Sequence, residues 1–456
     1  MDAVLVSDKK NDRAEPQQVQ TLVLPKNFEI SAEMQTAINA VSAGKSIFIT
    51  GRAGTGKSTL LTYLREEVLK STFIVVAPTG VAAINVGGST IHKFFGFLPD
   101  ITFEHIESPE YHPRSQKIMR NLKTLIIDEI SMVRADLMDC VDKALRKYGP
   151  KPTKPFGGVQ VILIGDLFQL SPIVTNSEKE FLYSHYETPF FFSSNGYRGL
   201  QMEKVVLNKV YRQSELDFLE ILNGIRINQT TPKTLDLLNT RVLPDFEAPR
   251  DKFFITLVAT NAMANRINND ELEKLPSDAY KSKAHITGAL TKSEYPAELE
   301  VSFKVGSQIM MLNNDSESRW VNGTLATIEE INLDDKKRDP NIVIKVASSE
   351  ERYVVSSHVW DIKRPRSQGN VLVYDTIGTF AQFPFMLAWA ITIHKSQGKT
   401  FENVIINLAA KAFAAGQLYV ALSRCTTLGG LVLRQEIDSS QVILDERVMD
   451  FHLDDL

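Results

Sequence analysis

Three things are scarce in this chain of 456 residues: cysteine, long apolar runs and an excess of charge of one sign. The two cysteines, Cys140 and Cys425, are too few for a disulfide framework or a cysteine-rich metal site. Both lie in apolar sequence contexts with helical spacing. We therefore expect buried thiols and a reducing, intracellular compartment such as the cytoplasm.

Apolar runs of membrane-spanning length are missing as well. The longest, Phe385 to Ile391, is far shorter than the ~20 residues that cross a bilayer. The segment Met1 to Lys10 has no apolar core of signal-peptide length. Hydrophobic residues make up 43% and charged residues 23%, as in globular proteins. We expect no membrane partner and, at this length, more than one domain.

The balance of positive and negative charge excludes few classes of binding partner. A net charge of −4 gives no sign that the chain as a whole attracts nucleic acid. Salt screens charges beyond about 8–10 Å, however, so an acidic body can still contain a locally basic channel. The class of partner therefore has to be decided from motifs.

The most informative motif that is present lies at Gly51 to Ser58, which reads G-x-x-x-x-G-K-S. It follows a β-rich apolar run and precedes helical spacing, which is the setting of a phosphate-binding loop. Backbone N–H groups and a helix N-terminus would face a phosphate chain. Lys57 would reach the β/γ-phosphates, and the Ser58 hydroxyl would ligate Mg²⁺. The motif predicts a nucleoside-triphosphate site made by Gly54, Thr55, Gly56, Lys57, Ser58 and Thr59.

Two carboxylates follow a second apolar strand. Asp128 and Glu129 come directly after the run Thr124 to Ile127. In a parallel sheet the carboxyl end of this strand faces the same crevice as the phosphate-binding loop. We expect Asp128 to hold Mg²⁺ through water and Glu129 to polarise the attacking water. Such a pair is often only a solvated loop, but the phosphate-binding loop favours the catalytic interpretation.

Three further residues are candidates for sensing the γ-phosphate. Gln169 follows a third strand, Val159 to Ile164, although a solvated glutamine explains that pattern equally well. Arg212 and Arg424 lie beyond the first α/β stretch, where an arginine can reach across a cleft as an arginine finger. For any single arginine a surface ion pair is the more common explanation.

The texture of the sequence predicts an α/β protein with an insert. Helix and strand alternate, except where short strands separated by turns such as Asn322-Gly323 indicate a small β-barrel. We predict a flexible polar tail at residues 1–26, a first domain at 27–206 with an insertion at about 97–114, a second domain beginning at 207–300, the β insert at 301–378, and the rest of the second domain with a C-terminal tail at 379–456.

The order of these motifs resembles that of superfamily-1 DNA helicases, specifically the Pif group (petite integration frequency) beside the RecD-like enzymes. The resemblance covers residues 27–434, nearly the whole chain. The matching elements are Gln35 (Q motif), Gly51 to Thr59 (motif I), Ala77 to Phe95 (Ia), Asp128-Glu129 (II), Gly165 to Leu170 (III), Tyr211 to Gln213 (IV), Ala390 to Thr400 (V) and Tyr419 to Arg424 (VI).

The resemblance implies two RecA-like domains, 1A and 2A, with ATP and Mg²⁺ at their interface. The insertion at 97–114 would be the small 1B domain, and the β insert would be an SH3-like 2B domain. Gln35 would read adenine, Tyr211 would stack on it, and Gly398 and Lys399 would complete the nucleotide site.

Single-stranded DNA would cross the upper surface of both domains. Small residues beside glycines suit backbone-close phosphate contacts, and flat side chains suit base stacking. For Phe94 core packing is the alternative, for His92 and His394 a structural role, and for Lys93 and Lys395 a solvated surface charge. The predicted DNA-binding residues are Pro78, Thr79, Gly80, Thr90, His92, Lys93, Phe94, Thr260, Asn261, His394, Lys395 and Ser396.

By resemblance the activity is ATP-dependent 5′ to 3′ translocation on single-stranded DNA and duplex unwinding. The long Ia element, a signature-like helix at Met132 to Tyr148 and the β insert favour this polarity. Expected partners are single-stranded DNA, single-strand/double-strand junctions, G-quadruplexes and RNA–DNA hybrids, handled by a monomer. DNA replication, repair and telomere maintenance are the processes implied, in a nucleoid, a nucleus or a mitochondrion. Two alternatives stay open: a translocase that strips proteins from nucleic acid, and an ATP-gated DNA clamp with little turnover.

Overall fold

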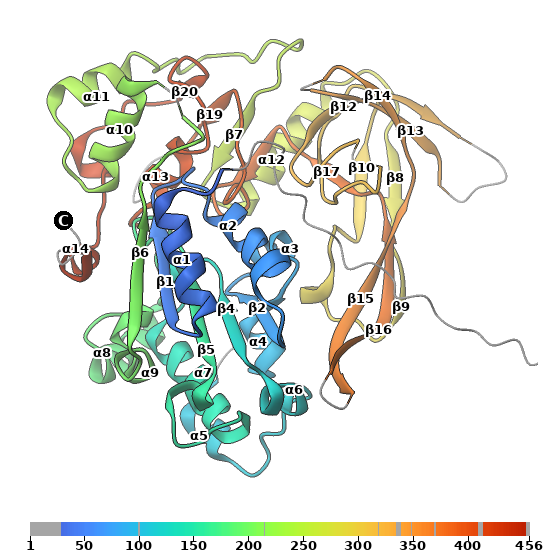
Figure 1. Ribbon diagram of the computed structural model, residues 1–456. Coiled ribbons are helices and arrows are strands. Elements are labelled where there is room, and N and C mark those ends of the chain that lie inside the picture. The colour runs from blue at the N-terminus through green and yellow to red at the C-terminus, as the bar shows by residue number, and fades with distance from the viewer. Residues whose placement is uncertain are drawn as a thin grey trace, which may run out of the picture.

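Figure 1 shows a computed structural model of the chain. It describes residues 29–98, 101–213, 215–317, 319–333, 339–347, 349–368, 371–408 and 414–452. The predicted N-terminal tail at 1–26 and the last four residues of the predicted C-terminal tail, 453–456, lie outside these ranges. Within them, no helix combines the length and the apolarity needed to cross a membrane.

The first half of the chain is built on a parallel sheet of six strands in the order β3-β2-β4-β5-β1-β6. All four residues of β4 are buried, and alternate side chains enter the apolar cores on opposite faces of the sheet. This two-sided burial explains the continuous apolar runs in the sequence. The strands are β1 (Ser46–Gly51), β2 (Phe73–Ala77), β3 (Ser89–Thr90), β4 (Thr124–Ile127), β5 (Gln160–Ile164) and β6 (Met202–Leu207).

Helices cover both faces of this sheet (Figure 1). They are α1 (Ala32–Ser42), α2 (Lys57–Tyr63), α3 (Gly80–Asn85), α4 (Ile91–Phe95), α5 (Phe103–Glu107), α6 (Gln116–Asn121), α7 (Ala135–Tyr148), α8 (Asn176–His185) and α9 (Asn195–Arg198). In the predicted 1B insertion, α5 packs against α7, and the Lys147 ammonium donates to the carbonyl oxygens of Ile106 and Ser108, each at 2.8 Å.

A second parallel sheet has four strands in the order β18-β7-β19-β20. Its strands are β7 (Ile255–Val258), β18 (Ala390–Thr392), β19 (Val404–Ile406) and β20 (Leu431–Leu433), and its helices are α10 (Leu216–Arg226), α11 (Pro232–Asn239), α12 (Asn261–Glu273) and α13 (Gln417–Leu422). Two parallel sheets with flanking helices confirm the predicted α/β class with paired RecA-like domains.

The remaining strands form antiparallel sheets in the orders β14-β13-β12-β11-β17, β15-β16-β9 and β10-β8. They are β8 (Tyr280–Lys283), β9 (His285–Gly288), β10 (Glu300–Phe303), β11 (Gln308–Met311), β12 (Leu325–Asn332), β13 (Asn341–Val346), β14 (Arg352–Val355), β15 (His358–Gln368), β16 (Val371–Gln382) and β17 (Phe385–Leu387). The long β15–β16 hairpin extends beside the first half of the chain, where β15 contacts α6 (Figure 1).

Pairing draws strands into this antiparallel part from both sides of the predicted insert at 301–378. The strand β17 pairs with β11, and β9 pairs with β16. The sequence pattern identified the segment that is rich in short strands. It did not reveal that strands outside this segment pair with those inside it, because such pairing has no local pattern. The SH3-like character of the insert and the domain boundaries stay predictions.

The last helix differs from our interpretation of 379–456 as second-domain and tail sequence. Helix α14 (Glu446–His452) lies against the first half of the chain. The Phe451 ring stacks on Phe192 with centroids 4.3 Å apart, and Val448 is buried in the same apolar core. Apolar side chains on a short helix do not indicate which of two cores will bury them.

Candidate nucleotide and nucleic-acid sites

The phosphate-binding loop connects β1 to α2. Gly54 and Gly56 have φ angles of 79° and 85°, in the left-handed region that favours glycine. A Cβ atom on Gly54 would lie 2.6 Å from the Cβ atom of Arg212, so a larger residue has no room there. Arg212 of the predicted second domain is therefore packed directly on the loop of the first.

Lys57 begins α2 and lies against this loop. Its ammonium donates to the carbonyl oxygens of Gly51 at 2.7 Å and Arg52 at 2.9 Å. Burial lowers the pKa of Lys57, while Asp166 and Glu129 act in the opposite direction. The structure thus places the only lysine of the motif among the groups that would surround a triphosphate.

The two predicted carboxylates lie in the same region. Burial, followed by repulsion from Glu129, raises the pKa of Asp128 to about 7. Burial also raises the pKa of Glu129, while the positive charges of Lys57, Arg424 and Arg212 oppose that shift. Glu129 has a φ of 49°, an uncommon conformation for a residue that is not glycine.

The donor set fits a hard divalent cation. Mg²⁺ prefers oxygen ligands and keeps several waters, so one hydroxyl and one carboxylate suffice from the protein. Ser58 on α2 is exposed, and Asp128 is a carboxylate whose pKa is raised by burial and then by the charge of Glu129. A bound cation would oppose that shift.

Both predicted arginine fingers gather at the end of α13. The Arg424 guanidinium donates from Nε to the carbonyl oxygen of Val420 at 2.9 Å and from Nη2 to the Ser423 hydroxyl at 2.8 Å. The Arg212 Nη1 atom donates to the carbonyl oxygen of Ser423 at 3.1 Å. Arg424 is 1% exposed, and burial lowers its pKa to about 9. The surface-ion-pair alternative is therefore wrong for Arg424.

Gln169 is also buried, and its amide donates from Nε2 to Oδ2 of Asp166 at 3.3 Å. Asp166 pairs with Arg226, which stands at the end of α10. Asp166 lies in motif III but had no role predicted from the sequence, and Arg226 was not predicted as a site residue. A lone arginine at the end of an amphipathic helix belongs to no motif, so no sequence signal distinguishes it.

The predicted adenine contacts lie on one side of the loop. Side-chain atoms of Met34 and Tyr211 are 2.9 Å and 3.7 Å from the position of a Cβ atom on Gly56. Tyr211 is 47% exposed, and the Lys209 ammonium lies 5.0 Å from the centre of its ring. The neighbouring Gln35 is exposed on α1 and donates to the Asn39 side chain at 2.9 Å. The roles of Gln35 and Tyr211 stay predictions.

Lys399 is not placed as predicted. Its ammonium donates to Oδ1 of Asn322 at 2.9 Å, in the loop between β11 and β12. Its backbone carbonyl accepts from Arg424 Nη1 at 3.3 Å, so the main chain reaches the nucleotide site while the side chain points elsewhere. Gly398 faces Asn85 of α3, whose amide nitrogen is 3.8 Å from the position of a Cβ atom. Motif resemblance located this turn but did not give side-chain direction.

Three of the predicted DNA-binding threonines cap helices. The hydroxyl oxygens of Thr79, Thr90 and Thr260 accept the backbone N–H of the residue three positions later, at 3.2, 3.2 and 3.3 Å. They begin α3, α4 and α12. Each hydroxyl keeps its own hydrogen for a phosphate oxygen, beside a helix N-terminus that favours anions.

Other members of the predicted track are accessible. Gly80, Lys93 and Asn261 are exposed, while Pro78 and Lys395 are half-buried. Pro78 lies between β2 and α3, and the others lie on α3, α4, α12 and the turn after β18.

Two of the predicted DNA-binding residues need correction. Phe94 is 3% exposed and contacts Phe95 edge-to-face in the core, so its ring cannot stack on a base. Ser396 is fully buried and donates to the carbonyl oxygen of Ile393 at 2.7 Å. Phe94 is the neighbour of Lys93 and Ser396 is the neighbour of Lys395. Both side chains point inward, where they anchor the helix and the turn to the interior.

The charged and aromatic members of the track are only partly available. Burial lowers the pKa values of His92 and His394, so both rings are neutral near pH 7. Lys93 forms an ion pair with Glu294 at 3.3 Å, between α4 and the residues that precede β10. A DNA phosphate at Lys93 would have to replace that carboxylate.

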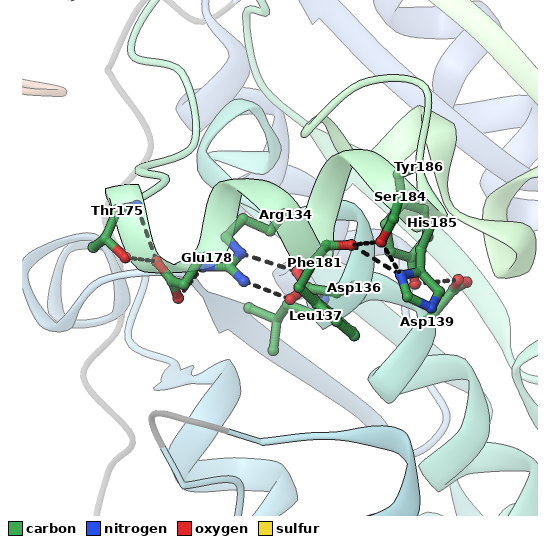
Figure 2. A network of polar contacts seen from close by, with 10 residues as sticks. All are labelled: Arg134, Asp136, Leu137, Asp139, Thr175, Glu178, Phe181, Ser184, His185 and Tyr186. Carbon is green, nitrogen blue, oxygen red and sulfur yellow. Dashed lines mark hydrogen bonds and ion pairs between the residues drawn. The ribbon is translucent and has the colours of Figure 1, made fainter.

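The signature-like segment takes part in a network of polar contacts. Figure 2 shows the Arg134 guanidinium between Asp136 at the start of α7 and Glu178 on α8. Tyr186 donates to the buried carboxylate of Asp139 at 2.9 Å. Arg134 also contributes to the lowered pKa of His92, which places the network beside the Ia element. The acidic residues of α7 are thus structural.

Comparison with known proteins agrees with this arrangement. The model of the family described as PIF1-like helicase matches residues 29–220, and that of the UvrD-like helicase C-terminal domain matches 387–432. The human ATP-dependent DNA helicase PIF1 is 31% identical over 96% of this chain, and the chain spans 66% of its length. The ATP-dependent DNA helicase Pif1 of Bdellovibrio bacteriovorus is 30% identical, with 93% of this chain and 92% of the relative covered.

Solved structures of Pif1 helicases are similar to this chain over most of its length. Pif1 from Bacteroides sp in complex with ADP-AlF4 has a TM-score of 0.82 at 35% identity, covering 94% of this chain and 97% of that one. Bacteroides Pif1 bound to ssDNA has a TM-score of 0.67 at 34% identity, with the same coverage.

The two parallel sheets, the phosphate-binding loop and the two arginines that meet at Ser423 place the chain among P-loop proteins of the helicase class. The relatives narrow that class further. The chain belongs to the PIF1-like helicase family.

Proposed function

We propose that the chain is an ATP-dependent DNA helicase that moves 5′ to 3′ on single-stranded DNA and separates duplexes. One observation carries the motor assignment. Arg212 packs on Gly54 of the phosphate-binding loop, Arg212 and Arg424 are both bonded to Ser423 at the end of α13, and both act on the charge of Glu129. Such a cleft responds to a γ-phosphate because groups from both sides contact it.

The roles of the residues follow from their positions. Lys57 would bind the β/γ-phosphates, and Ser58 with Asp128 would hold Mg²⁺, which neutralises phosphate charge when bound. Glu129 would orient and polarise the attacking water, and Gln169 would sense the γ-phosphate. Hydrolysis removes the contact that the two arginines share, so the cleft opens and the grip on DNA changes.

Single-stranded DNA is the proposed track, and single-strand/double-strand junctions are the proposed loading sites. The capped N-termini of α3, α4 and α12 supply oriented N–H groups for phosphates and read no sequence. Bacteroides Pif1 structures with ssDNA and at forked dsDNA support this choice of partner. Action on G-quadruplexes and RNA–DNA hybrids as a monomer is part of the proposal by family resemblance.

ATP turnover measured with and without single-stranded DNA tests this function. We expect turnover that depends on Mg²⁺ and rises when DNA is added, because DNA favours the closed cleft. A rate of ATP turnover that does not change when DNA is added would contradict the helicase and translocase assignments. Negligible ATP turnover together with tight ATP-dependent DNA binding would indicate a clamp.

DNA binding should weaken as salt rises and should not depend on base sequence. Replacing His394 and Lys395 together by alanine should reduce the salt slope by about 0.7, the value of one phosphate contact on a single strand. Only Lys395 carries charge, because burial keeps the pKa of His394 low. Fluorescence anisotropy over a salt series measures the slope.

A matched control is Lys233→Ala on α11, an exposed lysine away from α3 and α12 in Figure 1. It should leave the slope unchanged. Equal effects of the two changes would mean that Lys395 does not contact phosphate.

A further inference from the structure

A buried ion pair joins the two parallel-sheet halves of the molecule beside the nucleotide site. Asp166 follows β5 of the first sheet and is 0% exposed. Arg226 ends α10 of the second half, and its Nη2 atom lies 3.1 Å from Oδ1 of Asp166. The Arg226 side chain is 13% exposed, so water screens this pair little.

Arg226 makes further contacts that reach both halves. Its guanidinium carbon lies 3.9 Å from the centre of the Phe168 ring, a cation–π contact. Arg226 and Tyr419 of α13 line the same small cavity, and Tyr419 raises the pKa of Arg226. The Tyr419 hydroxyl in turn accepts the backbone N–H of Ala53 in the phosphate-binding loop at 2.9 Å.

Asp166 continues the connection on the other side. Its Oδ2 atom accepts from Gln169 Nε2 at 3.3 Å, and its Oδ1 atom accepts the backbone N–H of Phe168 at 3.2 Å. Burial alone would raise the pKa of Asp166, but Arg226 and then Lys57 hold it below its usual value. The carboxylate is therefore ionised and depends on Arg226 for its partner.

We propose that Arg226 is a positioning residue that couples the two halves of the motor: through Asp166 it orients Gln169, and through Tyr419 it connects the second half to the phosphate-binding loop. Among the described residues, Arg226 pairs with Asp166, stacks on Phe168 and lies beside Tyr419, so we expect its effect to pass through these neighbours. The inference rests on the proposed function and adds to it the route by which DNA on the second half reaches ATP turnover.

The chemistry of the pair allows its structural and coupling roles to be separated. Arg226→Met keeps an apolar stem against Phe168 but leaves Asp166 as a buried charge without its partner, which is strongly destabilising. Adding Asp166→Asn removes that charge, so stability should recover. The connection from Arg226 to Gln169 and Tyr419 stays broken in the double variant.

The experiment compares four proteins: wild type, R226M, R226M/D166N and R241M. Arg241 is the matched control, because its guanidinium donates to the carbonyl oxygens of Leu431 and Gly429 in the second half. Melting temperature is measured, together with ATP turnover with and without a poly-thymidine strand.

We expect R226M to melt earlier than wild type and to lose at least about tenfold of its stimulation by DNA, a typical size for coupling between sites. The double variant should regain most of the melting temperature but none of the stimulation. R241M should keep the wild-type stimulation whatever its stability.

The outcomes distinguish the two levels of the proposal. A wild-type chain without DNA-stimulated turnover would overturn the proposed function and this inference together. A stimulated wild type beside a stimulated R226M would overturn the inference alone. Recovery of stimulation together with melting temperature in the double variant would also overturn it, since Arg226 would then act only on stability.

Discussion

Lys57→Ala is expected to abolish ATP hydrolysis. The ammonium lies against the phosphate-binding loop, bonded to the carbonyl oxygens of Gly51 and Arg52. Loss of one preorganised group that stabilises charge in the transition state typically lowers turnover by about 10²–10³, and Lys57 also binds the ground-state phosphates. Steady-state phosphate release with saturating single-stranded DNA measures the loss.

Two comparisons sharpen this prediction. Lys45→Ala removes an exposed lysine paired with Glu203 at 2.5 Å and should leave turnover unchanged. Glu129→Gln should keep ATP binding, measured with a fluorescent analogue, but lose turnover, because the group that polarises water is neutralised while Asp128 stays. Near-normal turnover in Glu129→Gln would remove that residue from its role.

Arg424→Ala and Arg212→Ala should each lower DNA-stimulated turnover by about 10³–10⁵, the effect of an arginine that meets transition-state charge. Both guanidiniums are held at Ser423, and burial lowers the pKa of each because no solvent compensates the charge. A γ-phosphate between the sheets would supply the missing negative charge.

The melting temperature of each variant shows whether lost turnover comes from lost folding stability. A matched arginine variant gives a second control. Arg434→Ala removes an arginine of the same half that donates to the carbonyl oxygen of Pro244 at 2.6 Å, outside the site, and should leave turnover near wild type. A loss below about fivefold in either variant of Arg212 or Arg424 would match the roughly 1 kcal/mol of an ordinary surface pair. That residue would then be structural.

The parts of the site that the sequence predicted are those whose chemistry is local. The glycines around Lys57 must adopt left-handed conformations, and Asp128 must follow a buried strand, so short patterns identify them. Arg226 and Asp166 are 60 positions apart and meet only after two sheets have packed together. No spacing rule predicts such a meeting.

The direction of side chains was the second feature of the site that the sequence did not predict. Phe94, Ser396 and Lys399 all lie in motif elements identified from the sequence, yet Phe94 and Ser396 point into the core and Lys399 reaches Asn322. A motif fixes which turn approaches a ligand. Whether a given side chain faces the ligand or the core depends on packing against residues far away in sequence.

The same limit applies to the fold. The two parallel sheets follow from continuous apolar strands alternating with helices. The return of α14 to the first core and the pairing of β17 with β11 depend on contacts between distant segments, as does the neighbourhood of β15 and α6. These long-range pairings had no local signal.

The central claim is tested most directly by strand displacement on tailed duplexes. With ATP and Mg²⁺, the chain should open a duplex that bears a 5′ single-stranded tail and leave its 3′-tailed counterpart closed, while Glu129→Gln opens neither. Opening of the 3′-tailed duplex alone would contradict the proposed polarity. Vigorous DNA-stimulated ATP turnover without opening of either duplex would contradict the helicase assignment and leave a translocase.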